Sequence, residues 1–273
     1  MLESVFVFIF GLCMGSFLNV CIYRLPKEKS IINPRSFCPH CSKPIKWYDN
    51  IPLLSYLFLK GRCRQCGQKI AWRYPVVEVI TAVLFLFLYV QVGFNLLFLE
   101  FIFLFSVLIL VSFIDIEYHA IPAYICIIGI LGGLFMKAVA SWPMLKEDPL
   151  SVTSTPLFRS LKGMIFGFGF VYFFKLLGDL FISVLLRIRK KDSIEGEKES
   201  LGLGDVDFMG MIGVFMGIKG VVLTFFIAPF FAVLYSVFAL MFRKSHLIPY
   251  LPYLSLAAIT TFFWGHKILA VIF

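Results

Sequence analysis

Long apolar runs follow one another along almost the whole chain and alternate with short polar segments. A run of about 20 apolar residues is long enough to cross the hydrocarbon core of a bilayer as a helix. The pattern therefore predicts an all-α integral membrane protein with about eight transmembrane helices. These helices are expected at residues 4–23, 76–94, 95–114, 121–140, 160–187, 205–219, 220–242 and 251–272.

The sixth predicted helix, 205–219, is short for a membrane crossing. Its glycines, Gly210, Gly213, Gly217 and Gly220, recur every three or four residues. This spacing puts them on one face of a helix, where small residues let a neighbouring helix approach closely. The alternative is that they are scattered glycines, which are common in membrane helices.

The apolar run 4–23 resembles a secretory signal peptide in position, but Glu3 is the single charged residue before it. A signal peptide begins with basic residues and has a shorter apolar stretch. We therefore expect a retained first transmembrane helix within residues 1–23. A cytoplasmic domain is expected at 24–75, and a second transmembrane domain at 76–273.

Charge supports a membrane location and sets the orientation. The chain is 60% hydrophobic and carries a net charge of +9, which in a soluble protein would suggest nucleic acid. Here the basic residues gather in segments between the apolar runs, as the positive-inside rule requires, so we expect a lipid bilayer and no nucleic acid as partner. Lys175 and Asp179, four residues apart within 160–187, are expected to form a neutralised pair. The cytoplasmic side is expected to hold 24–75, 115–120, 187–204 and 243–250.

Four cysteines lie in two pairs within the segment 24–75. Cys38 and Cys41 are separated by two residues, as are Cys63 and Cys66, and 21 residues separate the pairs. Two such pairs can supply four thiolates to one tetrahedral zinc ion. Two disulfides and an iron–sulfur cluster are the alternatives, and a reducing cytoplasm disfavours disulfides. The spacing favours structural zinc, because four cysteines leave no open coordination position for catalysis.

Two aspartates lie at the predicted ends of membrane helices. Asp115 follows helix 95–114 and Asp205 begins helix 205–219, so the alternation of spans places both at the cytoplasmic boundary. A carboxyl pair can hydrolyse a peptide because one member deprotonates water while the other, still protonated, polarises the scissile carbonyl. We expect Asp115 and Asp205 to form such a pair. Asp205 is expected to be the base, since a helix N-terminus favours a charged carboxylate.

Together these motifs resemble those of the type IV prepilin leader peptidases, a family of membrane aspartic proteases with a GxGD motif. The resemblance covers nearly the whole chain and lies in GSFLNVCIYRLP (15–26), WYDNIPLLSYLFLKGRCRQC (47–66), RYPVVE (73–78), SFIDIEYHAIP (112–122) and GLGDVDF (202–208).

The resemblance implies that Asp115 and Asp205 carry catalysis. It implies removal of the leader from type IV prepilins and pseudopilins at the cytoplasmic face of the bacterial inner membrane. It further implies N-methylation of the new terminus with S-adenosylmethionine. A Gly-Lys pair before the third cysteine is linked to methylation in the family, and Gly61-Arg62 stands in its place here.

Two other functions are compatible with a polytopic chain. An ion-coupled membrane transporter would bind ions at Asp115 and Asp205, but such acids usually lie near the bilayer midplane and not at one interface. A non-catalytic membrane scaffold of a secretion system would use the cysteine domain for docking. An Asp205→Asn variant separates these functions, because only a protease would lose cleavage while retaining substrate binding.

Overall fold

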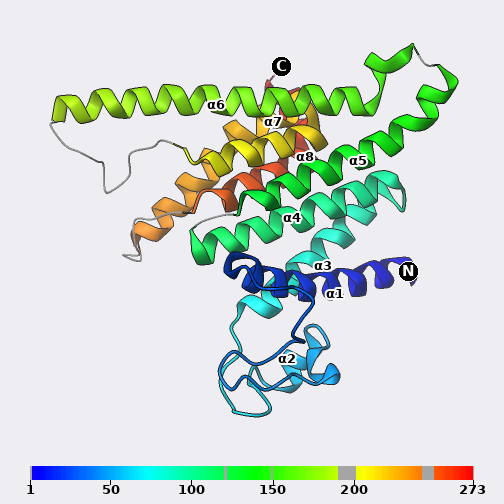
Figure 1. The fold of residues 1–273 in the computed structure, drawn as a ribbon, viewed down its shortest axis with the longest axis vertical. Coiled ribbons are helices and arrows are strands. Elements are labelled where there is room, and N and C mark those ends of the chain that lie inside the picture. The colour runs from blue at the N-terminus through cyan, green and yellow to red at the C-terminus, as the bar shows by residue number, and fades with distance from the viewer. Residues whose placement is uncertain (1, 120–121, 149, 190–200, 242–248, 273) are drawn as a thin grey trace. The chain divides into compact units, whose positions relative to one another are not determined.

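The computed structural model describes residues 2–119, 122–148, 150–189, 201–241 and 249–272. Helices make up nearly all of the regular structure in these residues (Figure 1). Parts of two polar segments used for the orientation, 190–200 and 242–248, lie outside them. The α-helices are α1 (Leu2–Arg24), α2 (Leu54–Phe58), α3 (Arg73–Val92), α4 (Leu96–Tyr118), α5 (Ala123–Glu147), α6 (Pro156–Arg189), α7 (Leu203–Met241) and α8 (Leu251–Ile272). The 3-10 helices are η1 (Leu25–Lys27), η2 (Trp47–Asn50) and η3 (Ser151–Ser154).

The predicted fold class is confirmed. Within the described residues, seven helices (α1 and α3 to α8) are long and apolar enough to cross a membrane, judged by length and composition. The segment with the four cysteines lies between the first two of them. The predicted sixth and seventh spans form one helix, α7, which departs from helical geometry at Gly217 (φ 66°, ψ −171°). This break lies close to the predicted junction between 205–219 and 220–242.

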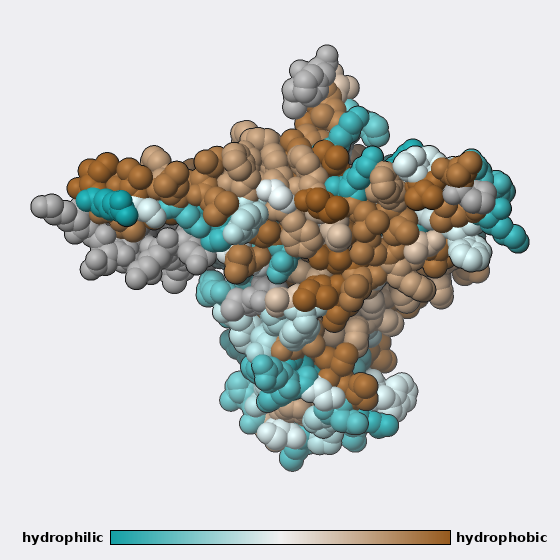
Figure 2. Space-filling model, turned by 45° about the horizontal axis from the view of Figure 1, so that its top comes forward, coloured by the Kyte–Doolittle hydropathy of each residue, from teal (hydrophilic) through white to brown (hydrophobic). Residues whose placement is uncertain are grey.

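Large apolar side chains face outward along these helices. Phe135 on α5 is 70% exposed and Phe230 on α7 is 76% exposed, and many neighbouring Leu, Ile and Val residues are similarly uncovered. Figure 2 shows such side chains over much of one face of the molecule. An apolar surface of this extent is unfavourable in water but suits contact with lipid chains. The protein is therefore a multi-pass membrane protein.

The chain divides into two compact units, residues 1–121 and 122–273. The first unit contains α1, α3, α4 and the segment with the four cysteines. Within it, α1 contacts both α3 and α4. The second unit contains α5 to α8, and α7 contacts each of the other three helices. Each unit thus packs its long helices directly against one another.

A seam of small residues joins α1 to α3 in the first unit. A Cβ atom added to Gly11 would lie 2.5 Å from Cα of Ala82, and one added to Gly15 would lie 2.6 Å from Cα of Glu78. One turn further along α1, the Asn19 side chain reaches the backbone of α3. The partner numbers fall as the α1 numbers rise, so the two helices run antiparallel at very close range. Glycine permits this approach because it has no side chain.

A second glycine seam joins α6 to α7 in the second unit. A Cβ atom at Gly163 would lie 2.2 Å from the carbonyl oxygen of Gly213, and one at Gly213 would lie 2.1 Å from that of Gly163. A Cβ atom at Gly210 would lie 2.5 Å from the ring of Phe168 on α6. The close approach predicted at Gly210 and Gly213 is confirmed. Gly217 lies in the same seam, since a Cβ atom at Gly163 would also lie 2.8 Å from its Cα, and it marks the break in α7 as well.

Candidate functional site

Two backbone knuckles with the same geometry carry the four cysteines. In each knuckle, the residue four positions after the first cysteine donates its N–H to that cysteine's carbonyl, at 2.8 Å from Ser42 to Cys38 and 2.9 Å from Gly67 to Cys63. Ser42 and Gly67 both have positive φ angles, of 56° and 72°. An isolated antiparallel β-bridge flanks each turn. The two knuckles thus present their sulfur atoms in equivalent ways.

The structure brings the four sulfur atoms together. The Sγ atoms of Cys38, Cys41, Cys63 and Cys66 all lie within 4.8 Å of one another, and those of Cys38 and Cys66 are 3.9 Å apart. A tetrahedral zinc ion with Zn–S bonds of 2.3 Å holds its sulfurs about 3.8 Å apart. All four cysteines are free thiols and not disulfides. The donor set and its spacing therefore fit a four-coordinate metal ion.

Hydrogen bonds in the second knuckle change the acidity of its thiols. The backbone N–H groups of Cys66 and Gln65 stabilise the thiolate of Cys63 and lower its pKa to about 7. The Gln68 N–H likewise favours the thiolate of Cys66, but desolvation and the three neighbouring sulfurs oppose it, and the pKa of Cys66 rises to about 11. A metal dication would stabilise all four thiolates at once, because only the deprotonated form binds the metal.

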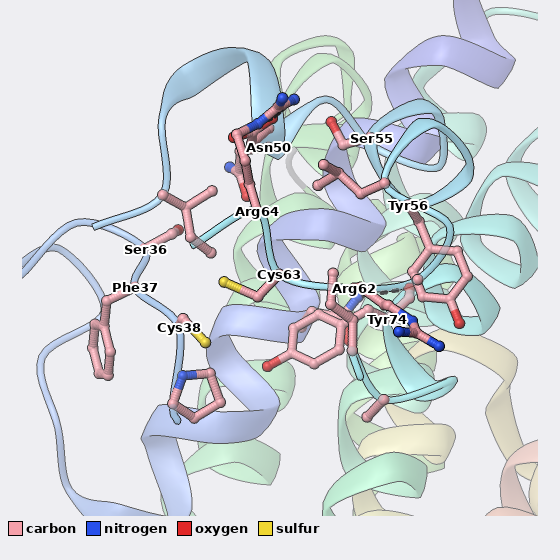
Figure 3. A pocket seen from close by; sticks show the side chains of 18 of the residues that line it. Ser36, Phe37, Cys38, Asn50, Ser55, Tyr56, Arg62, Cys63, Arg64 and Tyr74 are labelled. Atoms are coloured by element: carbon pink, nitrogen blue, oxygen red, sulfur yellow. Dashed lines mark hydrogen bonds and ion pairs between the residues drawn. The ribbon is translucent and has the colours of Figure 1, made fainter. Parts of the chain in front are cut away.

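A cavity of about 690 Å³ lies between the knuckles and the adjoining ends of α1 and α3 (Figure 3). Figure 3 shows Tyr56, Arg62 and Tyr74 on one side and Cys38 on the other. Gly61, in the same wall, has a φ of 65°, and a Cβ atom there would lie 2.9 Å from the hydroxyl oxygen of Tyr56. Glycine is therefore favoured at this position. The volume is typical of sites for small molecules.

Two buried charged groups in the cavity lining hold the surrounding backbone. Arg24 is 5% exposed, and its guanidinium donates to the carbonyls of Ser30 at 2.9 Å and Pro34 at 2.7 Å. Glu78 is 7% exposed, and its Oε2 accepts the N–H of Leu53 at 2.7 Å. The backbone at Leu53 has a φ of 59°, which is uncommon for leucine. Arg24 and Glu78 therefore fix the two loops that form the cavity.

Asp115 lies in the last turn of α4 and is 8% exposed. Its carbonyl accepts the N–H of His119 at 3.0 Å, and His119, with a φ of 50°, ends the helix. Two residues after Asp115, Glu117 forms an ion pair with Arg73, the first residue of α3. The end of α4 that carries the aspartate is thus tied to the start of α3.

Asp205 is half-buried in the first turn of α7. Its Oδ2 accepts the N–H of Gly202 at 3.1 Å. The preceding loop is held by Lys175 of α6, which is 6% exposed and donates from Nζ to the carbonyl of Leu201 at 2.8 Å. Lys175 also pairs with Asp179 at 3.1 Å, which confirms the predicted pair.

The predicted site residues therefore fall into three groups. The cysteines meet in one cluster, and Gly61 and Arg62 lie in the wall of the adjacent cavity. Asp115 belongs to the first unit and Asp205 to the second. Their pairing, with its catalytic role, stays a prediction.

Two features of the site were missed by the sequence interpretation. The first is the knuckle repeat, visible in hindsight when SFCPHCSKPI (36–45) is placed over GRCRQCGQKI (61–70). The second is the pair of polar side chains, Asn19 and Glu78, that α1 and α3 bring to the cavity. Asn19 and Glu78 both occur in or beside apolar runs, where a buried polar residue signals a functional site.

Comparisons with known proteins agree with these features. Residues 9–92 match the family described as the bacterial peptidase A24 N-terminal domain, and residues 102–237 match the type IV leader peptidase family. No solved structure matches the chain.

Several curated relatives carry names of the same kind. A prepilin leader peptidase/N-methyltransferase of Myxococcus xanthus is 36% identical over 79% of this chain and 56% of its own length. One of Bacillus subtilis is 30% identical over 97% of this chain and 95% of its own. A type 4 prepilin-like proteins leader peptide-processing enzyme of Escherichia coli is 32% identical over 93% and 91%. Matches that run through both chains almost from end to end establish common descent, and this chain belongs to the type IV leader peptidase family.

Proposed function

We propose that this protein is a membrane-embedded aspartic endopeptidase that removes the leader from type IV prepilins and pseudopilins. The observation that carries the proposal is the position of the two aspartate motifs. Both fall within residues 102–237, the segment that matches the leader peptidase family. Asp115 and Asp205 each occupy the end of a long apolar helix, α4 and α7. The names of the relatives describe leader removal as their activity.

In this proposal the two carboxyl groups divide the chemistry of hydrolysis. Asp205, at the start of α7 and with a hydrogen bond from Gly202, is the charged base that takes a proton from water. Asp115, at the end of α4, is the acid that donates a proton to the scissile carbonyl oxygen as the water oxygen attacks its carbon. The C–N bond then breaks as the leaving nitrogen takes the proton held by Asp205, and a hydroxyl of the tetrahedral intermediate returns its proton to Asp115. A neutron structure of an inhibitor complex with the protonation reversed would contradict this assignment.

The proposed location is the cytoplasmic face of the bacterial inner membrane. Basic residues in the segment 24–75 support this orientation through the positive-inside rule. A short basic leader would stay in the cytoplasm while the apolar segment of the pilin lies in the membrane, so the scissile bond would lie at the depth of the aspartates. We divide the chain into a first transmembrane helix at 1–23, the cysteine domain at 24–75 and the peptidase domain at 76–273.

We assign the cysteine cluster to structural zinc. Among residues 25–72, just three are buried: Cys38, Ser55 and Gly61. A segment with so little core needs another source of stability, which a metal ion bound by four thiolates supplies. The sulfur spacing and the matched knuckles support this assignment. Zinc would shape the cavity and take no part in cleavage.

A second activity, N-methylation of the new pilin terminus with S-adenosylmethionine, is proposed for the cavity. The relatives are named for both activities. Gly61 and Arg62, which correspond to the pair linked with methylation, line the cavity, and its volume suits a small molecule. When bound, S-adenosylmethionine would supply an activated methyl group. The chain's own residues would hold the cosubstrate and the terminal amine in reach of each other.

The test is to incubate the purified full-length protein with a prepilin, with and without S-adenosylmethionine, and to weigh the product. Loss of the leader mass establishes cleavage, and the further mass of one methyl group establishes methylation. Asp115→Asn and Asp205→Asn should each slow cleavage by about a hundredfold or more while retaining substrate binding. Asp207→Asn is the matched control, since Asp207 is also half-buried near the start of α7. A wild-type protein that binds prepilin but never cleaves it would favour the scaffold, and ion uptake into vesicles would favour the transporter.

A further inference from the structure

A buried acceptor in the cavity lining lacks a partner. Asn19 of α1 is 2% exposed, and its Nδ2 donates to the carbonyl oxygen of Tyr74 at 3.0 Å. This bond fixes the orientation of the amide, because only the NH₂ group can donate to a carbonyl. The other atom of the amide, Oδ1, is buried and has no hydrogen-bond partner in the described part of the chain. Buried acceptors rarely stay unpaired in proteins, so this oxygen indicates a missing donor.

A carboxylate lies one helical turn further along the same seam. Gly15 contacts the backbone at Glu78, and Asn19, four residues later on α1, contacts the backbone at Tyr74, four residues earlier on α3. Both Asn19 and Glu78 line the cavity. Glu78 accepts hydrogen bonds from the Leu53 N–H and from the Ser16 side chain. An ionised carboxylate offers about four acceptor positions, so Glu78 retains capacity for a ligand.

Three arginines of the cavity lining hold other groups. Arg24 donates to the carbonyls of the loop that follows α1. Arg64 binds Asp49, and Arg73 pairs with an acid on α4. None of the ion pairs among the described residues involves Glu78. A buried carboxylate is normally paired, so Glu78 has room for a cationic ligand.

A primary ammonium group meets both requirements, because it has three N–H donors, a positive charge and no acceptor. We propose that Asn19 Oδ1 and the Glu78 carboxylate form an ammonium-binding subsite for the α-amino group that leader cleavage exposes on the mature pilin. This inference rests on the proposed function, which supplies such an amine.

The subsite would place the amine for methyl transfer. An α-amino group has a pKa near 8, so at neutral pH it binds mainly as the ammonium. Its nitrogen must lose one proton, which Glu78 is placed to accept, before its lone pair can attack. The new N–CH₃ bond then forms as the methyl–sulfur bond breaks, and the sulfur keeps that electron pair as a neutral thioether. The product leaves as the N-methylammonium ion with two N–H protons, and Glu78 releases the proton it accepted to solvent.

The first experiment uses the wild-type full chain in detergent and three synthetic peptides, with binding measured by calorimetry. One is the lysine-free N-terminal segment of a mature pilin with a free amine, the second is its N-acetylated form, and the third is an N-acetylated leader containing lysine. The free amine should bind about tenfold or more tighter than the acetylated form, because the lost contacts involve charged groups. Equal binding would overturn the proposal. Tighter binding of the leader peptide would also overturn it, by assigning the subsite to a lysine side chain.

The second experiment asks whether the named residues give this preference. Glu78→Gln keeps an oxygen that can accept the Leu53 N–H but removes the charge, and it should abolish the preference for the free amine. Asn19→Ala should reduce it. Glu3→Gln is the matched control, because Glu3 joins α1 to Tyr89 of α3 at the opposite end of the helix pair. If Glu78→Gln still preferred the free amine to the acetylated peptide as strongly as the wild type does, the assignment would be refuted. If a variant fails to fold, the peptide comparison on the wild-type protein decides the question.

Methyl transfer to a pre-cleaved pilin separates this inference from the proposed function. A wild-type protein that neither cleaves nor methylates would refute the proposed function itself. A protein that does both, yet binds the free and acetylated peptides equally well, would refute the subsite alone. The expected pattern is a lower ratio of methyl transfer to leader cleavage in Glu78→Gln than in Glu3→Gln.

Discussion

Replacing Gly15 with alanine tests the α1–α3 seam and its link to the cavity. The added Cβ atom would lie 2.6 Å from Cα of Glu78, where an ordinary contact is at least 3.4 Å. The obstacle is backbone, which cannot rotate away as a side chain can. The two helices must therefore separate by about 0.8 Å at this point, or the chain must strain.

The expected size of the effect follows from this displacement. Overpacking of a close contact costs about 1–3 kcal/mol, which for a chain of this size lowers the melting temperature by roughly 2–12 °C. One turn away, the bond from Asn19 to the Tyr74 carbonyl is 3.0 Å long. A separation of about 0.8 Å would stretch it to about 3.8 Å, beyond the range of a hydrogen bond. Gly15→Ala should therefore lose methyl transfer as well as stability.

Gly11→Ala is the matched control. Its Cβ atom would meet the backbone of Ala82 at 2.5 Å, an equally severe clash one turn further from the cavity. Thermal unfolding in detergent should show similar losses for both variants, whereas methylation of a pre-cleaved pilin at a temperature where both are folded should fall more in Gly15→Ala. A Gly15→Ala protein with wild-type melting temperature and wild-type methylation would refute the reasoning.

Three further outcomes are expected. Chelation of the metal should expose the segment 25–72 to proteases, and added zinc should restore protection; an unchanged digestion pattern would argue against a structural metal. Lys175→Met removes the bond to the Leu201 carbonyl that holds the loop before the second aspartate, so kcat for cleavage should fall about tenfold with little change in KM, and an unaltered kcat would count against this role. Gly163→Ala should destabilise the protein by about 1–3 kcal/mol in thermal unfolding, since its Cβ atom would meet a carbonyl oxygen at 2.2 Å. Gly169→Ala, with no atom within 4 Å, should not destabilise it.

The long helices could be predicted from the sequence because lipid imposes a simple rule on it. A run such as 95–114 has to satisfy its backbone within one helix, so apolar length alone identified α4. The spacing of three residues between Gly210 and Gly213 also predicted their packed face, because such a spacing places residues on one side of a helix. The break at Gly217 could not be predicted from this pattern, because a positive φ depends on the individual residue and its surroundings.

The site was less predictable because its parts depend on contacts between distant segments. The cysteine cluster could be inferred, since metal ligands have a recognisable spacing. Asn19 appears in the sequence as an isolated polar residue within an apolar run, and its importance becomes visible only when α3 supplies Tyr74 as a partner for one atom of the amide and none for the other. The fixed loop at Leu53 likewise depends on Glu78, which lies far along the chain.

The interruption at Gly217 divides α7 into pieces of unequal reach. From Leu203 to Met216 an α-helix rises about 21 Å, less than the roughly 30 Å of a bilayer's hydrocarbon layer. Asp205 therefore lies near the free end of a short helical segment that ends at the break. Because Gly210 and Gly213 hold this short segment directly against α6, the location of Asp205 is set by α6 and is independent of the longer part of α7 beyond Gly217.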